Sequence, residues 1–488
     1  MHGQPGRFST TAMVLALMAT WWVAPAAPAA VAAGPAIDWH RCGDGFQCGS
    51  LPVPVDYARP ASPTIDLAVI RQPARRSRSR LGAIVVNPGG PGAPAVAYLR
   101  SLADVLPNDL RDRFDLVAFD PRGVGASSPI RCGDGVDPLF DQAFSPERPE
   151  ERAALLDAFR RVATACMQHD AGILAHVSTR EGAHDLDRLR AALGEPRLTF
   201  LGLSYGTYLG TLYASAYPRR VRAMVLDGVI DPALDAEATA LAQARGFEHA
   251  LDDFLADCAA HPGCPYHHGG HPAGAYDRLR ARVARLPIPA PETNGRTLNQ
   301  TRFDAAVLHE LYLGRAGWST LARALAAAER GDASGLLDMA DTFVGRQSDG
   351  TDDHSLEAFW AVRCLDGPAA DVATMARIEA RAVHVAPRIG AFVVNMSLAC
   401  SVWPVAALPS TRALRASGAP AILVVGTTDD PATPLSQARS LARELDRGVL
   451  LVARGEQHTA FVEGNACVDR VVTHYLVDRE PPKDGTRC

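Results

Sequence analysis

The sequence Leu198-Thr-Phe-Leu-Gly202-Leu-Ser204-Tyr-Gly206-Thr-Tyr-Leu-Gly210 decides the fold of this chain. A short apolar run, Leu198–Leu201, leads into the pattern G-x-S-x-G, and an apolar helical pattern follows it. The glycines are needed because a serine in this strained strand-to-helix turn leaves no room for neighbouring side chains. The helix N-terminus behind the serine also favours negative charge that develops there. The pattern predicts that Ser204 is a nucleophile. The alternative is a small-residue turn that only lets the helix pack closely.

Similar apolar runs occur along the whole chain, and each ends in turn residues. Continuous Val/Ile/Leu runs without alternation are typical of strands that are buried on both faces. Helical patterns lie between several of them, as in Glu150–Gln168, Thr179–Leu193 and Pro434–Leu445. This alternation predicts an α/β fold with a mostly parallel sheet. The other expected strands are Ile65–Ile70, Ala83–Val86, Leu116–Phe119, Val221–Leu226, Ala421–Val425 and Val449–Val452.

The alternation stops between about Pro232 and Leu408, where only helical patterns are expected. A Pro/Asn/Gly-rich segment within it, Pro287–Asn299, is expected to be a loop. The interruption is as large as a domain. We therefore predict a core in two parts, residues 34–231 and 409–488, and a helical lid domain over residues 232–408. The expected lid helices are Ala236–Ala260, Gly274–Leu286, Arg302–Leu313, Trp318–Arg330, His354–Arg363 and Asp371–Val385.

A glycine-rich loop, Asn87-Pro-Gly-Gly90-Pro-Gly92, directly follows the strand expected at Ala83–Val86. Such a loop exposes backbone N–H groups that can point at an oxyanion. In hydrolases with a serine elbow the second donor is the amide of the residue after the nucleophile, here Tyr205. We therefore expect Gly90 and Tyr205 to form an oxyanion hole. The alternative is a Gly/Pro turn without function.

An acid and a histidine follow the last two expected strands. The strand Ala421–Val425 leads into Asp429 and Asp430, and the strand Val449–Val452 leads into His458. Ser…Asp…His is the chain order of triads in α/β-hydrolases. The carboxyl ends of parallel strands share one edge of the sheet, so the three side chains are expected to meet there. The residues alone do not separate Asp429 from Asp430.

Composition excludes some classes of protein. The chain has 488 residues, of which 47% are hydrophobic, so a large core is available and global disorder is excluded. Its formal net charge of -5 argues against nucleic-acid binding, which normally needs a basic surplus.

The first 33 residues have the features of a secretory signal peptide. Arg7 supplies the positive charge, and Ala12–Val23 is an apolar run that is too short to span a bilayer. Small residues follow, and we expect cleavage between Ala33 and Gly34. The alternative is an uncleaved anchor helix. No other run reaches the length of a membrane span.

All ten cysteines follow this segment, and an even number behind an export signal predicts disulfides. Short loops cost little entropy to close, so we expect each cysteine to pair with its neighbour along the chain. The alternative is a set of buried free thiols. A metal site built from Cys258, Cys264 and the histidines at 267, 268 and 271 matches no standard zinc spacing. The expected pairs are Cys42–Cys48, Cys132–Cys166, Cys258–Cys264, Cys364–Cys400 and Cys467–Cys488.

Taken together, these motifs resemble the exported tripeptidyl-aminopeptidase-like serine peptidases of actinobacteria. These are α/β-hydrolases that are related to proline iminopeptidases and include mycobacterial cell-envelope hydrolases. In that family the catalytic acid stands immediately before P-x-T-P, which selects Asp430. Pro88 stands where the histidine of the H-G-G-P-G loop of proline iminopeptidases would be, but the glycines are kept. The resemblance covers nearly the whole mature chain and is carried by Trp39–Cys42, Gln47–Cys48, Val53–Tyr57, Asn87–Gly92, Phe119–Gly125, Gly202–Gly210, Asp430–Pro434 and His458.

The resemblance implies a triad of Ser204, Asp430 and His458 without metal or cofactor. An aminopeptidase must also hold the α-ammonium of its substrate, which calls for an acid in the lid. Asp366 is our candidate, since the family has a Cys-x-Asp in the same part of the lid. The alternatives are a solvated carboxylate that caps the next turn, or a role for one of the rival acids Glu357, Asp352 and Asp353.

Three classes of function follow from these features. The first is a secreted or cell-envelope aminopeptidase that releases tripeptides or dipeptides from peptide N-termini. The second is a carboxylesterase or lipase that acts on envelope or extracellular esters with the same triad, because a fold does not fix a substrate. The third is a binding protein on an inactive hydrolase scaffold, which the complete triad argues against. We expect a monomer that acts on a peptide or small ester and binds no nucleic acid, and peripheral association with the envelope stays open.

Overall fold

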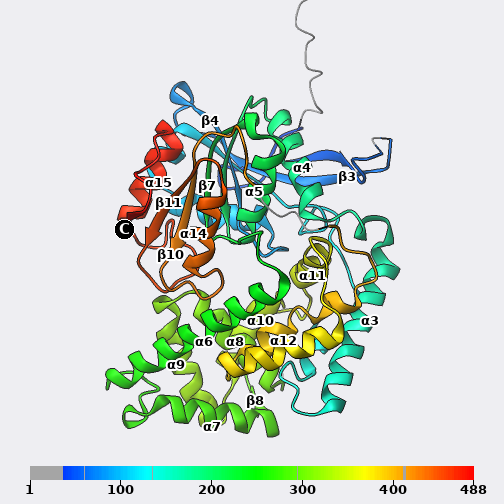
Figure 1. The fold of residues 1–488 in the computed structure, drawn as a ribbon, viewed down its shortest axis with the longest axis vertical. Coiled ribbons are helices and arrows are strands. Elements are labelled where there is room, and N and C mark those ends of the chain that lie inside the picture. The colour runs from blue at the N-terminus through cyan, green and yellow to red at the C-terminus, as the bar shows by residue number, and fades with distance from the viewer. Residues whose placement is uncertain (1–36, 60, 134–135, 294, 410–413) are drawn as a thin grey trace, which may run out of the picture. The chain divides into compact units, whose positions relative to one another are not determined.

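The apolar runs form neighbouring strands of one ten-stranded sheet, with the order β1-β2-β3-β5-β4-β6-β7-β10-β11-β12 (Figure 1). The structure is a computed structural model that describes residues 37–59, 61–133, 136–293, 295–409 and 414–488. The expected signal peptide and its cleavage site lie outside the described residues. The strands are β1 (His40–Arg41), β2 (Gln47–Pro54), β3 (Thr64–Gln72), β4 (Gly82–Asn87), β5 (Phe114–Phe119), β6 (Leu198–Leu203), β7 (Val221–Asp227), β10 (Ile422–Thr427), β11 (Gly448–Ala453) and β12 (Thr486–Arg487).

The sheet is mostly parallel, as predicted. From β5 through β4, β6, β7, β10 and β11 to β12 every pair is parallel, and only β1, β2 and β3 add an antiparallel edge. Every residue of β4, β5, β6 and β10 is buried, which is why these strands lack polar alternation. The carboxyl ends of these strands therefore meet at one edge, where ligand sites of such sheets form.

Helices cover both faces of the sheet. Successive strand residues point to opposite faces, so Val85 packs into the core under α4, α5 and α14, whereas Val86 packs into the core under α1, α2 and α15. This double cover confirms the α/β-hydrolase architecture that the sequence predicts. The helices are α1 (Ala95–Val105), α2 (Asn108–Arg113), α4 (Thr179–Ala192), α5 (Tyr205–Ala216), α14 (Leu435–Glu444) and α15 (Ala466–Asp478).

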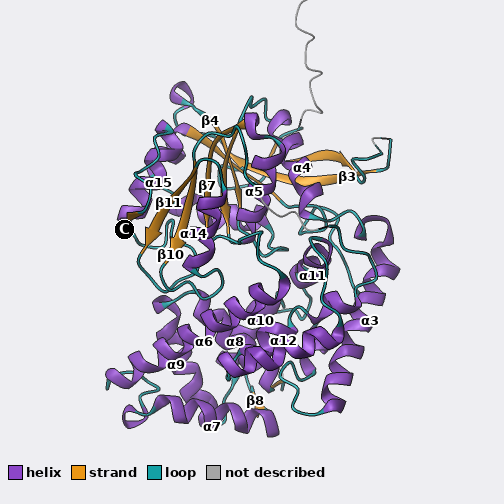
Figure 2. Cartoon of the chain, in the orientation of Figure 1, coloured by secondary structure: helices purple, strands orange, loops and turns teal. Residues whose placement is uncertain are grey.

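A layer of helices is inserted between β7 and β10 and has its own hydrophobic core (Figure 2). The six predicted helices are all present to within three residues at either end. Two more were not predicted, α10 and α13; the six residues of α13 are too few to give a clear periodic pattern. The helices of the insertion are α6 (Ala236–Ala260), α7 (Pro272–Arg285), α8 (Gln300–Tyr312), α9 (Arg315–Glu329), α10 (Ser334–Val344), α11 (Ser355–Leu365), α12 (Val372–Val385) and α13 (Gly390–Asn395).

Two features of this layer differ from expectation. The expected loop Pro287–Asn299 contains a short antiparallel pair, β8 (Ile288–Pro289) with β9 (Thr297–Leu298), and strands of two residues are too short to show a pattern. Residues between Val136 and Phe159, which include the start of α3 (Pro149–Leu174), bury apolar side chains in the core of the inserted helices. Figure 1 shows α3 at the side of the helical layer. The boundaries of the lid domain at 232 and 408 stay a prediction.

The ten cysteines form the five predicted neighbour pairs. Each pair joins parts of one region, such as α11 to the 3-10 turn η5 (Leu398–Val402) through Cys364–Cys400. Disulfides of this number are typical of proteins in an oxidising compartment. Within the described ranges, no helix combines the length and apolar character that crossing a bilayer requires. The remaining pairs are Cys42–Cys48, Cys132–Cys166, Cys258–Cys264 and Cys467–Cys488.

Candidate active site

Ser204 stands alone between the end of β6 and the start of α5, with the strained backbone angles of φ 53° and ψ −125°. Few residues other than glycine adopt a positive φ, and such a conformation persists only where the surroundings enforce it. Its backbone N–H donates a hydrogen bond of 2.8 Å to the carbonyl of Asp227. A Cβ atom at Gly206 would lie 2.6 Å from the carbonyl oxygen of Asn87, so only glycine fits there. This turn therefore presents the serine hydroxyl at the carboxyl edge of the sheet.

The glycine-rich loop after β4 packs directly against this turn. Gly89 and Gly90 have φ values of 107° and 102°, and a Cβ at Gly89 would lie 2.8 Å from the Cβ of Ser204. The Gly89 amide donates to Asn87 Oδ1 at 3.1 Å and is therefore engaged. Within the described ranges, neither the Gly90 amide nor the Tyr205 amide has an acceptor. Both residues border the same cavity as Ser204, which leaves two donors for an oxygen of a bound substrate.

Asp430, and not its rival Asp429, contacts His458. Both carboxylate oxygens of Asp430 lie 2.9 Å from Nδ1 of His458. The same carboxylate accepts hydrogen bonds from the amides of Ala432 and Thr433 and from the Thr433 hydroxyl, each 2.9 Å long. The side chain of Asp429 is 44% exposed, and its partners are Thr428 and His249 rather than His458. The buried Asp430 is thus a rigidly held acceptor for a proton on Nδ1.

His458 is enclosed by protein on several sides. Its ring contacts the ring of Tyr312 edge to face at 5.4 Å, and a Cβ at Gly228 would lie 3.0 Å from its Cε1. Burial by itself lowers the pKa of the imidazole, but the carboxylates of Asp430, Asp227 and Glu463 together raise it by more, so that the pKa lies above its ordinary value. Nε2 is buried and has no hydrogen-bond partner in the described chain. Hydrogen bonds to a nucleophile are frequently long before substrate binds.

Asp227 is a residue of this site that sequence analysis did not single out. It ends β7, and besides accepting from Ser204 through its carbonyl, its carboxylate accepts from the amides of Ala460 and Phe461 at 2.9 and 2.8 Å. Complete burial raises the pKa of this carboxyl to about 6, although the two amide bonds oppose the shift. Asp227 therefore links the serine turn to the loop that carries His458. An acid directly at the end of an apolar run is the signal that could have revealed it.

A cavity of about 480 Å³ opens over Ser204 between the sheet edge and the inserted helices. This size is typical of small-ligand sites. The sheet side supplies Gly90, Ser204 and Tyr205, and the helical side is mostly apolar. The apolar side chains from the inserted helices include Phe247, Leu308, Phe343, Leu356, Phe359, Met375, Val393 and Met396.

Asp366 caps the C-terminus of α11 and lies in the wall of this cavity. Its carboxylate accepts from the Thr179 amide at 2.8 Å and from the Thr179 hydroxyl at 2.5 Å. The Tyr205 hydroxyl in turn contacts the Thr179 hydroxyl. Burial raises the pKa of Asp366 to about 7, against the opposing bonds from Thr179. The ionisation of this carboxyl is therefore shifted towards the neutral pH range.

The rival acids of the insertion do not border the cavity. Glu357 is fully buried and lies 3.0 Å from Nδ1 of His354. Asp352 accepts from the amide of Val136, and Asp353 accepts from the amide of Ser355. Of the four acids, Asp366 alone borders the cavity, so it is the candidate for contact with a ligand.

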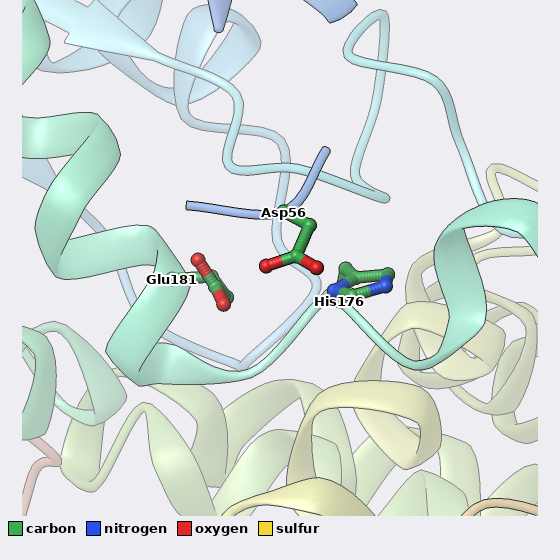
Figure 3. Close-up of side chains that lie close together, drawn as sticks. All are labelled: Asp56, His176 and Glu181. Carbon is green, nitrogen blue, oxygen red and sulfur yellow. The ribbon is translucent and has the colours of Figure 1, made fainter. Parts of the chain in front are cut away.

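One group of potential metal ligands lies outside the cavity. Ligand atoms of Asp56, His176 and Glu181 lie within 4.8 Å of one another (Figure 3). The Asp56 carboxylate, however, already pairs with Nε of Arg59 at 2.6 Å, and Glu181 lies 4.0 Å from a nitrogen of Arg122. Two guanidinium groups at these carboxylates oppose a cation, so this group does not fit a metal site.

The fold and the serine turn define the chain as a serine hydrolase of the α/β-hydrolase class. The family of TAP-like proteins matches residues 386–488. Over 482 residues the chain is 36% identical to the serine protease Hip1 of Mycobacterium tuberculosis, covering 93% of this chain and 91% of that protein. It is 37% identical over 486 residues to carboxylesterase B of the same species, covering 94% and 91%. It is 33% identical over 496 residues to the tripeptidyl aminopeptidase of Streptomyces lividans, covering 95% and 90%. The chain belongs to this family of tripeptidyl-aminopeptidase-like hydrolases.

Proposed function

We propose that the protein is an exported serine aminopeptidase that releases short peptides, tripeptides or dipeptides, from free peptide N-termini. The observation that carries this proposal is the presence of Ser204 and the buried carboxyl of Asp366 in the wall of one cavity. A carboxylate with little solvent around it suits an α-ammonium group. The relatives named serine protease and tripeptidyl aminopeptidase support peptide chemistry.

The reaction starts with the transfer of the Ser204 proton to Nε2 of His458 as Oγ attacks the scissile carbonyl. Asp430 holds the proton on Nδ1, so that Nε2 is the free base, and it stabilises the imidazolium that forms. The imidazolium then protonates the leaving amine, the C–N bond breaks, and an acyl-enzyme remains. Water, activated by the same histidine, hydrolyses the ester and restores Ser204.

The amides of Gly90 and Tyr205 stabilise the negative oxygen of the tetrahedral intermediate. Neither amide donates a hydrogen bond to another group within the described chain, which supports this role. A donor of this kind contributes about 3 kcal/mol to the transition state. Both amides belong to backbone that is fixed by the sheet and by α5, so no reorganisation is needed when charge develops.

Asp366 sets how much peptide is released. A carboxylate that is fixed by Thr179 holds the ammonium at a constant distance from Ser204, and the number of residues that fit between them is the length of the product. The five disulfides fit an environment outside the cytosol. We therefore propose export through the N-terminal segment 1–33, and action as a monomer that is secreted or associated with the cell envelope.

Hydrolysis of esters is the second candidate, and the carboxylesterase relative favours it. The same serine, histidine and oxyanion donors act on esters, whereas an ester substrate does not need the ammonium site. The two functions therefore differ in whether they require Asp366.

A panel of chromogenic mono-, di- and tripeptide amides, each free and N-acetylated, beside short acyl esters tests the proposal. We expect acetylation of the best peptide to lower kcat/KM about 10- to 150-fold, because a charge-assisted bond in a closed pocket is lost. Asp366→Asn should lower kcat/KM for the free peptide equally, and the two losses should not add. Asp338→Asn, in an exposed position of α10 that does not border the cavity, is the matched control. An unchanged kcat/KM after acetylation would exclude the aminopeptidase and favour the esterase.

A further inference from the structure

Among the described residues that line the cavity, Arg363 is the only one with a basic side chain. It lies on α11, three residues before Asp366, and its side chain is partly accessible because it borders the cavity. Its guanidinium lies 5.7 Å from the ring of Phe359. The mechanism above does not use this group, although it lies in the same cavity as the nucleophile.

Arg363 forms no ion pair and no side-chain hydrogen bond within the described residues. Its guanidinium lies over the ring of Phe359, and the carboxyl of Asp366 interacts with it electrostatically without forming an ion pair. The three acids of the cavity wall are engaged elsewhere: Asp231 accepts from the Ala233 amide, Asp235 caps α6, and Asp366 accepts from Thr179.

Three other buried or half-buried arginines each have an aspartate partner. Arg122 is 1% exposed and pairs with Asp185 at 2.6 Å, and Arg280 pairs with Asp304 at 2.7 Å. Arg302 is 8% exposed and pairs with both Asp137 and Asp141. Arg222, which has no aspartate partner, donates instead to the carbonyls of Leu476 and Val477. Arg363 has neither kind of partner among the described residues.

A guanidinium that is removed from bulk water without a partner is costly. Burial lowers the pKa of Arg363, whereas Tyr312 and Asp366 oppose the shift. An arginine nevertheless keeps its proton in a protein. A carboxylate can accept two parallel hydrogen bonds from this planar group, which makes it the ligand that best removes the cost.

We propose that Arg363 binds a carboxylate of the substrate, so that the enzyme prefers substrates with an acidic group in the part that enters the cavity. This inference rests on the proposed aminopeptidase function, since Asp366, less than one helical turn away, then holds the α-ammonium. The nearest acidic group of such a substrate is an aspartate or glutamate side chain close to its N-terminus. The other source is the C-terminal carboxylate of a very short peptide.

Two sets of substrates separate these sources. Tripeptide p-nitroanilides with glutamate or glutamine at each position in turn have no C-terminal carboxylate, so they report on the side chain alone. Alanine tetrapeptides with a free or an amidated C-terminus report on the terminal carboxylate alone. We expect kcat/KM to favour the acidic member of at least one pair about tenfold or more.

Arg363→Gln should reduce that ratio to near one. Arg415→Gln is the matched control, because Arg415 is an exposed partner of Asp446 that does not border the cavity, and it should leave the ratio as in the wild type. Ratios near one for every pair in the wild type, or an unchanged ratio in Arg363→Gln, would overturn the proposal.

Binding to the Ser204→Ala protein separates this proposal from the proposed function. Calorimetry with alanine tripeptide amides that carry glutamate or glutamine at each position in turn, and with Ala-Ala-Ala as acid and amide, measures carboxylate recognition without hydrolysis. A tighter acidic member in at least one pair supports the subsite even if no peptide is cleaved. Equal affinities within every pair overturn it even if uncharged peptides are good substrates.

Discussion

The hydroxyl of Ser204 is the group on which the proposed chemistry depends. We expect Ser204→Ala to abolish hydrolysis and labelling by a fluorophosphonate probe, because no other residue stands at the strained turn. His458→Ala should lose a comparable factor, on the order of 10⁴ or more, because triad residues act as a unit. Far-UV circular dichroism and thermal unfolding check that both variants stay folded. Labelling of Ser204→Ala at a single site would place the nucleophile elsewhere.

The two neighbouring aspartates allow a matched comparison at the same scale. Asp430→Asn should lower kcat by a larger factor than Asp429→Asn, because an asparagine amide that donates to Nδ1 favours the wrong tautomer of His458. Steady-state kinetics on one good substrate are sufficient. Equal losses of kcat would leave the catalytic acid unassigned. A larger loss in Asp429→Asn would assign that role to Asp429.

At the scale of the element, Asp366 caps the C-terminus of α11, and its ionisation should control which substrates are preferred. Asp366 faces Thr179, Tyr205, Arg363 and Arg180, and its pKa is about 7. The carboxyl must be ionised to hold an ammonium, so the advantage of free over acetylated peptide should be lost as pH falls through about 7. It should also decline above about pH 8, where the substrate amine loses its proton.

The ratio of kcat/KM for free and acetylated peptide, measured from pH 5 to 9 in roughly half-unit steps, checks this expectation. His458 must also be neutral to act as a base, but it affects both substrates and cancels in the ratio. In Asp366→Asn the ratio should be flat below about pH 7. A wild-type ratio that does not change with pH would exclude Asp366 as the ammonium site.

At the scale of the whole molecule, five disulfides cross-link local regions of the chain. We expect no free thiols in the denatured, unreduced protein and a mass increase of about 10 Da on full reduction, two protons for each bridge. Closing loops of 34 and 36 residues, as in Cys132–Cys166 and Cys364–Cys400, stabilises the fold by about 3–4 kcal/mol each. Reduction should therefore lower Tm, which scanning calorimetry measures. A stoichiometric free thiol would contradict the five bridges.

The sequence by itself determined the fold class, because its signals are local. Strands buried on both faces, such as β4 and β6, appear as continuous apolar runs, and a serine between Gly202 and Gly206 identifies a turn in which side chains have no room. The chain order of serine, acid and histidine also follows from the sequence, since parallel strands end at one edge. The neighbour pairing of the cysteines is local in the same sense.

Which groups touch became clear only from the tertiary structure. It showed that Asp430, which the family resemblance selects, contacts His458, and that Asp227 joins the serine turn to the histidine loop. It also packed the start of α3 with the inserted helices, because an amphipathic pattern shows that a face is buried but not against what. Whether Arg363 forms an ion pair depends in the same way on how distant segments pack. Contacts of this kind form only when the separate segments fold together, so no local pattern of residues contains them.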